Sequence, residues 1–118
     1  MASLKSRQVG SITILQPKGY LTGGEETEHL DQAIKRLAEG GNRHLVVDLG
    51  EVQHLNSTAL GVLISAHTNY VRRGGQMKLC SVDKRIENIF VITKLSLVFD
   101  VYAGEEQAIA SFAEKESV

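Results

Sequence analysis

Short apolar runs alternate with longer segments of helical periodicity along most of this chain, and that alternation limits the fold more than any other feature. The run Leu45-Val46-Val47 is continuous, as is typical of a strand that is covered on both faces. Segments with helical spacing precede and follow it. Strands that alternate with helices predict an α/β fold whose central sheet is mostly parallel, with right-handed crossovers.

The N-terminal segment predicts an antiparallel addition to this sheet. Two strand-like runs, 4–9 and 12–16, are joined by Gly10-Ser11, which is typical of a tight hairpin turn. Alternation within 12–16 predicts a half-buried strand. Pro17 is expected to close it, because proline donates no backbone hydrogen bond.

Four segments have the periodicity of α-helices. Thr22 and Glu25 have the spacing of a capping box, which would start the first helix. The second helix is expected to have an inward stripe of Leu60, Leu63, Ile64, His67 and Val71, and a basic cluster of Arg72, Arg73 and Lys78 at its end. Later strands are expected at 77–82 and 97–102, and later helices at 84–93 and 105–114. The segment from Asp48 to Thr58 is expected to be a loop.

Charge and composition exclude several classes of function. The 118 residues include 13 basic and 14 acidic side chains, a net charge of −1, so the chain has no general attraction for nucleic acid or anionic membranes. The longest nearly apolar run, 59–64, is too short to cross a bilayer. The single cysteine, Cys80, cannot form an internal disulfide and is expected to be a packed thiol. We therefore expect one cytoplasmic domain without membrane insertion or a nucleic-acid partner.

The sequence offers little for catalysis, metals or cofactors. The four histidines have no paired metal-ligand spacing, and the glycine pairs lack the motifs of phosphate-binding loops. Asp48 at a strand end suggests a receiver domain that is phosphorylated on aspartate. A receiver needs an acidic pair near the end of its first strand to hold Mg²⁺, and this chain has Gln16-Pro17-Lys18-Gly19 there, which argues against a receiver. We expect a protein that is not an enzyme and that holds neither a metal nor a cofactor.

The most informative segment is 48–63, in which Asn56, Ser57 and Thr58 directly precede a helix. All three residues are good helix caps, so capping alone is one explanation. The other explanation is that a hydroxyl here is phosphorylated, because helix-start amides and the helix dipole stabilise a phosphate in place. The modification would add about two negative charges to a small surface without disturbing the fold.

From Ile12 to Phe112 the chain resembles the STAS family, specifically the bacterial anti-sigma factor antagonists. The strongest matching segments are Leu45-Val46-Val47-Asp48-Leu49, Val52, Leu55-Asn56-Ser57-Thr58-Ala59-Leu60-Gly61 and Gly74-Gly75-Gln76. The resemblance implies one STAS-like domain over 1–118, with a core of about 12–112. Its fold would be a mixed central β-sheet, an N-terminal hairpin plus parallel strands, with about four α-helices.

The centre of the family pattern is Asp-Ser-(Ser/Thr)-Gly-Leu, in which the first serine is phosphorylated. On that match Ser57 would be the phosphoacceptor, with Thr58 as the second choice. The chain departs from the pattern at three positions. Asn56 replaces the usual aspartate, Ala59 replaces the usual glycine, and Thr22 stands where many members have an acidic residue.

The resemblance implies a non-enzymatic partner-switching protein. The unmodified surface would bind an ATP-binding serine/threonine kinase that acts as an anti-sigma factor, and a sigma factor or another client would be released. That kinase would phosphorylate Ser57, and a phosphoserine phosphatase would reset it. The residues expected to bind the partner are Thr22, Asn56, Ser57, Thr58, Ala59 and Leu60. A weak homodimer is also compatible with the resemblance.

A second hypothesis is a STAS subunit of a membrane lipid or ion transport assembly. In that case the segment before the second helix would be a fixed docking element, and Ser57 would only cap the helix.

Overall fold

The computed structural model describes residues 4–116, which form an α/β fold with two β-sheets. The strands are β1 (Lys5–Val9), β2 (Ile12–Gln16), β3 (Lys18–Leu21), β4 (His44–Asp48), β5 (Glu51–Leu55), β6 (Gln76–Cys80) and β7 (Asp100–Tyr102). The helices are α1 (Glu25–Glu39), α2 (Ser57–Arg72), α3 (Lys84–Ile92) and α4 (Glu105–Glu116), with a short 3-10 helix η1 (Leu95–Leu97) before β7. The four α-helices within the described residues confirm the expected number.

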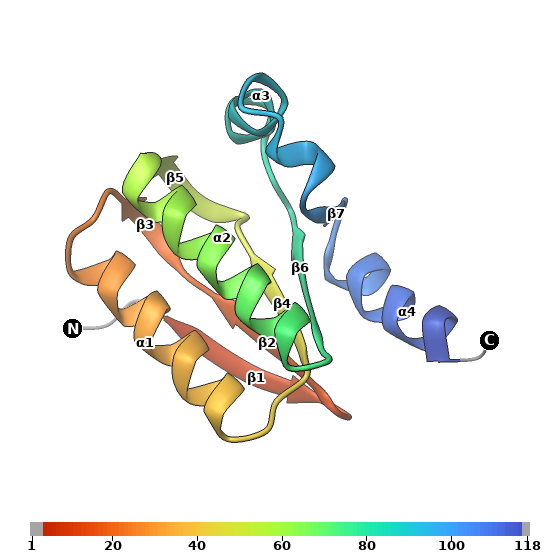
Figure 1. The fold of residues 1–118 in the computed structure, drawn as a ribbon. Helices are drawn as coiled ribbons and strands as arrows, with labels where there is room; N and C mark the ends of the chain where they lie inside the picture. The colour runs from red at the N-terminus through yellow and green to blue at the C-terminus, as the bar shows by residue number, and fades with distance from the viewer. Residues whose placement is uncertain (1–3, 117–118) are drawn as a thin grey trace.

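The main sheet has five strands in the order β1-β2-β4-β6-β7 (Figure 1). β1 and β2 form the expected antiparallel hairpin, and the remaining neighbours pair in parallel. The prediction of a half-buried strand at β2 is wrong, because Ile12, Thr13, Ile14 and Leu15 are all buried. β2 has a neighbour on each edge and core residues on each face, so both alternating sets of its side chains are enclosed.

Helices cover both faces of the main sheet. α1 and α2 pack on one face and contribute to the larger hydrophobic core, together with α3. α4 contacts β4, β6 and β7 on the other face, where Ala108 and Phe112 join a second core cluster. Both clusters are needed to bury a parallel sheet, whose strands expose apolar side chains on both faces.

The inward face of α2 differs from the expected stripe in its second half. Tyr70 is fully buried where Val71 was expected, while Ile64 is 37% exposed and Val71 is 54% exposed. The Tyr70 hydroxyl donates a hydrogen bond to Asn42 Oδ1 at 2.8 Å. A buried tyrosine needs such a partner, and the sequence around α2 does not contain it.

The prediction that Lys78 joins Arg72 and Arg73 in a basic cluster is also wrong. Lys78 is fully buried on β6, and its Nζ donates to Ser111 Oγ on α4 at 2.6 Å. The same Nζ lies 4.4 Å from the centroid of the Phe112 ring. Its charge is therefore enclosed beneath α4, and it does not contribute to the surface at the end of α2.

A second sheet of two parallel strands, β3 and β5, was not expected. β5 lies in the segment that was expected to be a loop. Leu21 at the end of β3 pairs with Leu55 at the end of β5, and the Asn56 amide donates to the Leu21 carbonyl at 3.1 Å. The small sheet therefore brings the start of α1 next to the start of α2.

The capping box predicted from Thr22 is wrong. The N-cap of α1 is Gly24, which makes no side-chain cap, and the Gly23 amide donates to Thr27 Oγ1 at 3.0 Å instead. Gly23 has φ +95°, and a Cβ there would lie 3.3 Å from Thr58 Cγ2. A glycine at this position lets the β3–α1 loop approach the first turn of α2 closely.

We predict that Gly75→Ala destabilises the fold more than Gly74→Ala. A Cβ at Gly75 would lie 2.5 Å from the Arg43 carbonyl oxygen, which accepts the Gln76 amide at 2.8 Å and so cannot withdraw freely. At Gly74 a Cβ meets open space, but φ is +83°. We expect losses in the free energy of unfolding of about 3 kcal/mol for Gly75→Ala and about 1–2 kcal/mol for Gly74→Ala, measured by urea denaturation. Equal losses would contradict the steric argument.

Candidate functional site

The candidate site is the start of α2 together with the β3–α1 loop beside it. Asn56 has an extended backbone and is the N-cap of α2. Its Oδ1 accepts the Ala59 amide at 3.1 Å, and its Nδ2 donates to the Thr22 carbonyl at 2.9 Å. One side chain therefore starts the helix and holds the neighbouring loop against it.

Ser57 is the first residue of α2, and its side chain is exposed. Within residues 4–116 its hydroxyl makes no hydrogen bond, because Asn56 supplies the cap. Of the three residues that the sequence offered as caps, the structure uses Asn56 alone. Capping therefore does not explain the serine at position 57.

The structure brings together the six residues that we expected to bind a partner, but it does not expose them equally. Thr22, Ser57 and Thr58 are exposed, Asn56 is half-buried, Ala59 is 1% exposed and Leu60 is 8% exposed. The last two side chains anchor the first turn of α2 in the core. The surface available to a macromolecule is therefore formed by the three exposed residues, and their binding role stays a prediction.

The electrostatics of this helix start favour an anion. The first turn of α2 contains no acidic residue, whereas the first turn of α1 contains three. Helix geometry leaves the amides of Ser57 and Thr58 without intrahelical acceptors, at the positive end of the helix dipole. A phosphate on the Ser57 oxygen would lie close to these amides.

An exposed aromatic pair flanks the site and was missed from the sequence. Tyr20 on β3 is 61% exposed, and its ring centroid lies 6.2 Å from that of His54 on β5. These residues come two positions before Thr22 and Asn56. Only the pairing of β3 with β5 brings the two rings together, so no local signal could have revealed them.

A second polar cluster joins β1, β4 and α4. Burial raises the pKa of the Asp48 carboxyl, and the neighbouring Glu105 raises it further. The hydrogen bond and ion pair from Arg7 hold the pKa of Glu105 below its ordinary value. Asp48 Oδ1 also accepts the Gly50 amide at 2.8 Å. These contacts fix the start of α4 against the end of β4.

The remaining shifted groups serve packing or helix capping. Burial raises the pKa of the Cys80 thiol to about 11, so the thiol stays protonated at neutral pH, as expected for a packed cysteine. Burial likewise raises the pKa of Tyr70 to about 12. Asp83 caps α3 by accepting the Ile86 amide at 3.0 Å, and this bond is the main cause of its lowered pKa.

Within the described part of the chain, no group of three histidine, cysteine, aspartate or glutamate side chains could hold a metal ion. No helix between residues 4 and 116 is both long enough and apolar enough to span a bilayer.

Comparison with known proteins identifies the family. Residues 3–108 match the STAS domain. The chain belongs to the STAS domain family. It is 31% identical over 80 residues to the anti-sigma-B factor antagonist of Bacillus subtilis (strain 168), which covers 68% of this chain and 72% of that protein.

Solved STAS structures share the fold. The anti-sigma factor antagonist SpoIIAA in its unphosphorylated form has a TM-score of 0.81 at 15% identity, over 94% of this chain and 96% of that chain. The Bacillus cell fate determinant SpoIIAA in its phosphorylated form has a TM-score of 0.74 at 14% identity, over 92% of this chain and 98% of that chain. The resemblance to STAS proteins of the anti-sigma factor antagonist type, and the α/β fold that it implied, are thus confirmed.

We predict that Asn56→Ala and Ser57→Ala differ sharply in stability. Asn56→Ala removes the cap and the bond to Thr22, and should lower the free energy of unfolding of this STAS domain by about 1–2 kcal/mol. Ser57→Ala should change it by less than about 0.5 kcal/mol. Urea denaturation of both variants measures the difference. A loss for Ser57→Ala as large as that for Asn56→Ala would show that the serine caps the helix.

We also predict a pH-dependent effect of Asp48→Asn. A raised pKa means that the folded state binds the Asp48 proton more tightly than the unfolded state, so this contribution is present at low pH and is lost as the pH rises through the folded pKa. Asparagine cannot ionise. The variant should therefore gain stability relative to wild type as the pH rises above about 4, the ordinary pKa of an aspartate in the unfolded chain. Thermal unfolding as a function of pH tests it, with the exposed Glu51→Gln as control, and a pH-independent difference would contradict it.

Proposed function

We propose that this STAS domain is an anti-sigma factor antagonist that switches partners when Ser57 is phosphorylated. The observation that carries the proposal is the exposed Ser57 hydroxyl at the first position of α2, which the helix cap leaves unused. The serine of the matching family pattern stands at the same place. The names of the curated relatives and of the structural neighbours support the same general role.

In the unmodified state, the exposed residues of the site form a neutral surface. The expected partner is an ATP-binding serine/threonine kinase that acts as an anti-sigma factor, and its capture releases a sigma factor. Asn56 and the glycine turn at Gly23 hold the two loops in place before binding. Little loop ordering is then needed at the moment of association, which favours affinity.

Phosphorylation would change the surface without unfolding the helix. The phosphate adds about two negative charges, and the helix dipole favours it by only about 0.3–1 kcal/mol. Burying the same phosphate against a partner surface that fits a neutral hydroxyl would cost about 3–4 kcal/mol, or roughly 200- to 1,000-fold in affinity. That difference is sufficient for a switch, and a phosphoserine phosphatase would reverse it.

Asn56 supports this chemistry in a specific way. Its amide oxygen caps α2 as an aspartate would, but without a charge beside the phosphoacceptor. Its Nδ2 also donates to the Thr22 carbonyl, a bond that an ionised carboxylate cannot donate. The departure from the family aspartate therefore keeps the cap and lowers the repulsion that a phosphate on Ser57 would meet.

We predict that Ser57→Asp weakens binding to the proposed partner kinase by about 100-fold, because it places a charge in the interface. Ser57→Ala should bind like wild type but gain no phosphate when ATP is added. Titration calorimetry measures the affinity and mass spectrometry the phosphorylation. Ser65→Asp is the matched control, since Ser65 is an exposed serine further along α2.

Three outcomes would count against the proposal. Equal affinity for wild type and Ser57→Asp would exclude switching by charge. Phosphorylation of the Ser57→Ala variant would place the phosphoacceptor elsewhere. Copurification with a transporter ATPase, with Ser57 unmodified, would favour the docking role in a transport assembly instead.

A further inference from the structure

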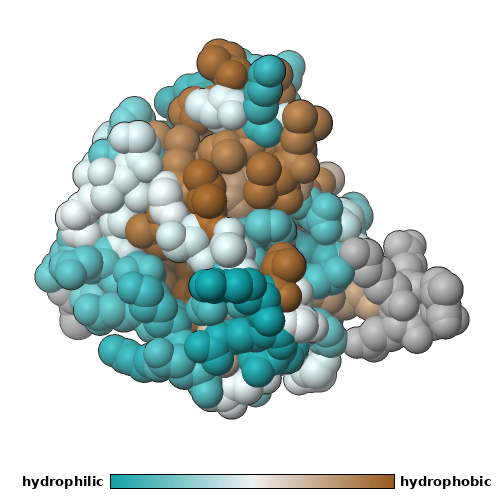
Figure 2. Space-filling view, in the orientation of Figure 1, coloured by the Kyte–Doolittle hydropathy of each residue, from teal (hydrophilic) through white to brown (hydrophobic). Residues whose placement is uncertain are grey.

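Exposed apolar side chains are concentrated in one stretch of the chain, from the end of α3 to β7. Among the described residues, nine large hydrophobic side chains are exposed, and five of them lie between positions 91 and 101. These five are Val91, Ile92, Leu97, Val98 and Val101, which we call the α3–β7 patch. Figure 2 shows hydrophobic surface gathered in the upper part of the molecule, where Figure 1 places α3. Clustering of this kind marks an interaction surface, whereas scattered apolar residues do not.

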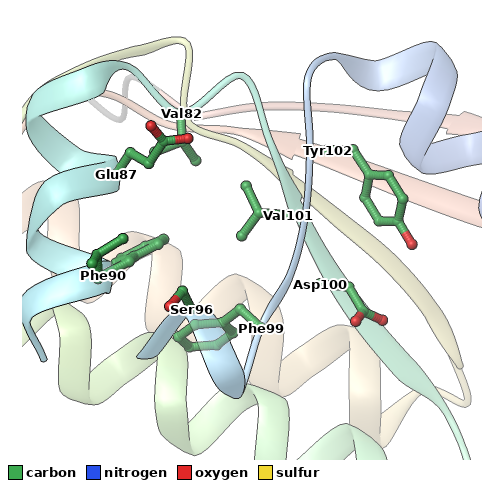
Figure 3. A pocket seen from close by; sticks show the side chains of 9 residues that line it. Val82, Glu87, Phe90, Ser96, Phe99, Asp100, Val101 and Tyr102 are labelled. Carbon is green, nitrogen blue, oxygen red and sulfur yellow. The ribbon is translucent and has the colours of Figure 1, made fainter. Parts of the chain in front are cut away.

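A groove of about 420 Å³ between α3 and β7 adjoins this patch, and Val91 and Val101 of the patch line it. Phe90 and Phe99 are buried beneath it, with ring centroids 5.7 Å apart. Figure 3 shows the Val101 side chain directed from β7 towards α3, with Asp100 and Tyr102 on the opposite side of the strand. The groove is therefore apolar on the face of β7 that Val101 occupies.

The outer edge of β7 is open. β7 is the last strand of the main sheet, and no strand in the described residues pairs with its outer edge. The Tyr102 carbonyl accepts the Ser81 amide on the inner side at 3.1 Å. Because backbone groups alternate in direction along a strand, the amide and carbonyl of Val101 point outwards. An extended segment can add to such an edge by main-chain hydrogen bonds.

The charges around the groove indicate which side chains a bound segment would have. Glu87 lines the groove from α3, Asp100 extends from β7, and both are exposed. In an added strand, the residue opposite Val101 would face the groove, and the residue opposite Asp100 would face that carboxylate. The best fit has an apolar side chain in the groove and basic side chains next to it.

We propose that the edge of β7 and the groove beside it bind an extended segment of a partner protein, in which an apolar residue that faces the groove alternates with basic residues. The other edge strand of this chain fits less well as an occupant. It carries Lys5 and Arg7, but Ser6 stands between them where the groove needs an apolar side chain. This interaction does not require phosphorylation of Ser57, so its test is independent of the proposed function.

The probe is a seven-residue peptide of alternating lysine and valine, with both termini blocked, titrated into the isotope-labelled full chain and followed by NMR. We expect saturable shifts at Val101 and its neighbours on β7 and α3, with a dissociation constant on the order of 0.1–1 mM. A peptide with glutamate in place of lysine should bind at least about tenfold more weakly.

The matched variants are Val101→Lys and Val9→Lys. Both valines lie on edge strands, and they are 38% and 40% exposed, so the two substitutions cost the fold about equally. Val101→Lys should weaken peptide binding at least about tenfold, whereas Val9→Lys should bind like wild type. Asp100→Asn, at an exposed position, should weaken binding of the lysine peptide and leave the fold unchanged.

Several results would overturn the proposal. These are the absence of shifts on β7 at millimolar peptide, shifts on β1 instead, equal binding of the glutamate peptide, or equal effects of the two valine variants. Concentration-dependent self-association that Val101→Lys abolishes would show that a second copy occupies the edge, and would also overturn it.

Discussion

The Asn56 side chain joins the two segments from which the candidate site is built. It accepts the Ala59 amide within α2 and donates to the Thr22 carbonyl across the β3–α1 loop, while its own backbone amide bonds to Leu21. These contacts come from one residue and fix a corner between two strands and two helices. They leave the Ser57 hydroxyl exposed and unbonded, so a modification of that oxygen need not break a contact that the fold depends on.

The protein has two surfaces with different chemistry, the start of α2 and the α3–β7 patch. The start of α2 is polar, and its affinity for a partner would respond to a change of charge at Ser57. The α3–β7 patch is apolar with carboxylates at its rim, and phosphorylation of Ser57 would leave its composition unchanged. The opposite face of the sheet is closed, because Lys78 and Ser111 hold α4 against β6. A partner that used both surfaces would combine a switchable contact with a constant one.

The regular elements of the fold were predictable, and the irregular contacts between them were not. The hairpin, the buried strand β4 and the helices have hydrophobic periods that span several residues, and they were expected close to their observed positions. β5 contains only two apolar residues that are buried, Val52 and Leu55, which is too weak a pattern to identify a strand. The capping box failed for a related reason. The spacing of Thr22 and Glu25 permits a cap, but the loop contact at Gly23 sets where α1 begins.

The sequence by itself determined the α/β class, the number of α-helices and the place of Ser57 at the start of one of them, because these depend on residues close together in the chain. Only the tertiary structure decided that Asn56 is the cap, that Ala59 and Leu60 belong to the core, and that Lys78 lies beneath α4. Lys78 depends on Ser111, which is far away along the chain, and Asn56, which caps α2 through the nearby Ala59 amide, also bonds to the distant Thr22 carbonyl. Local patterns specify helices and strands, but the partner of a polar side chain is set by which elements the fold brings into contact.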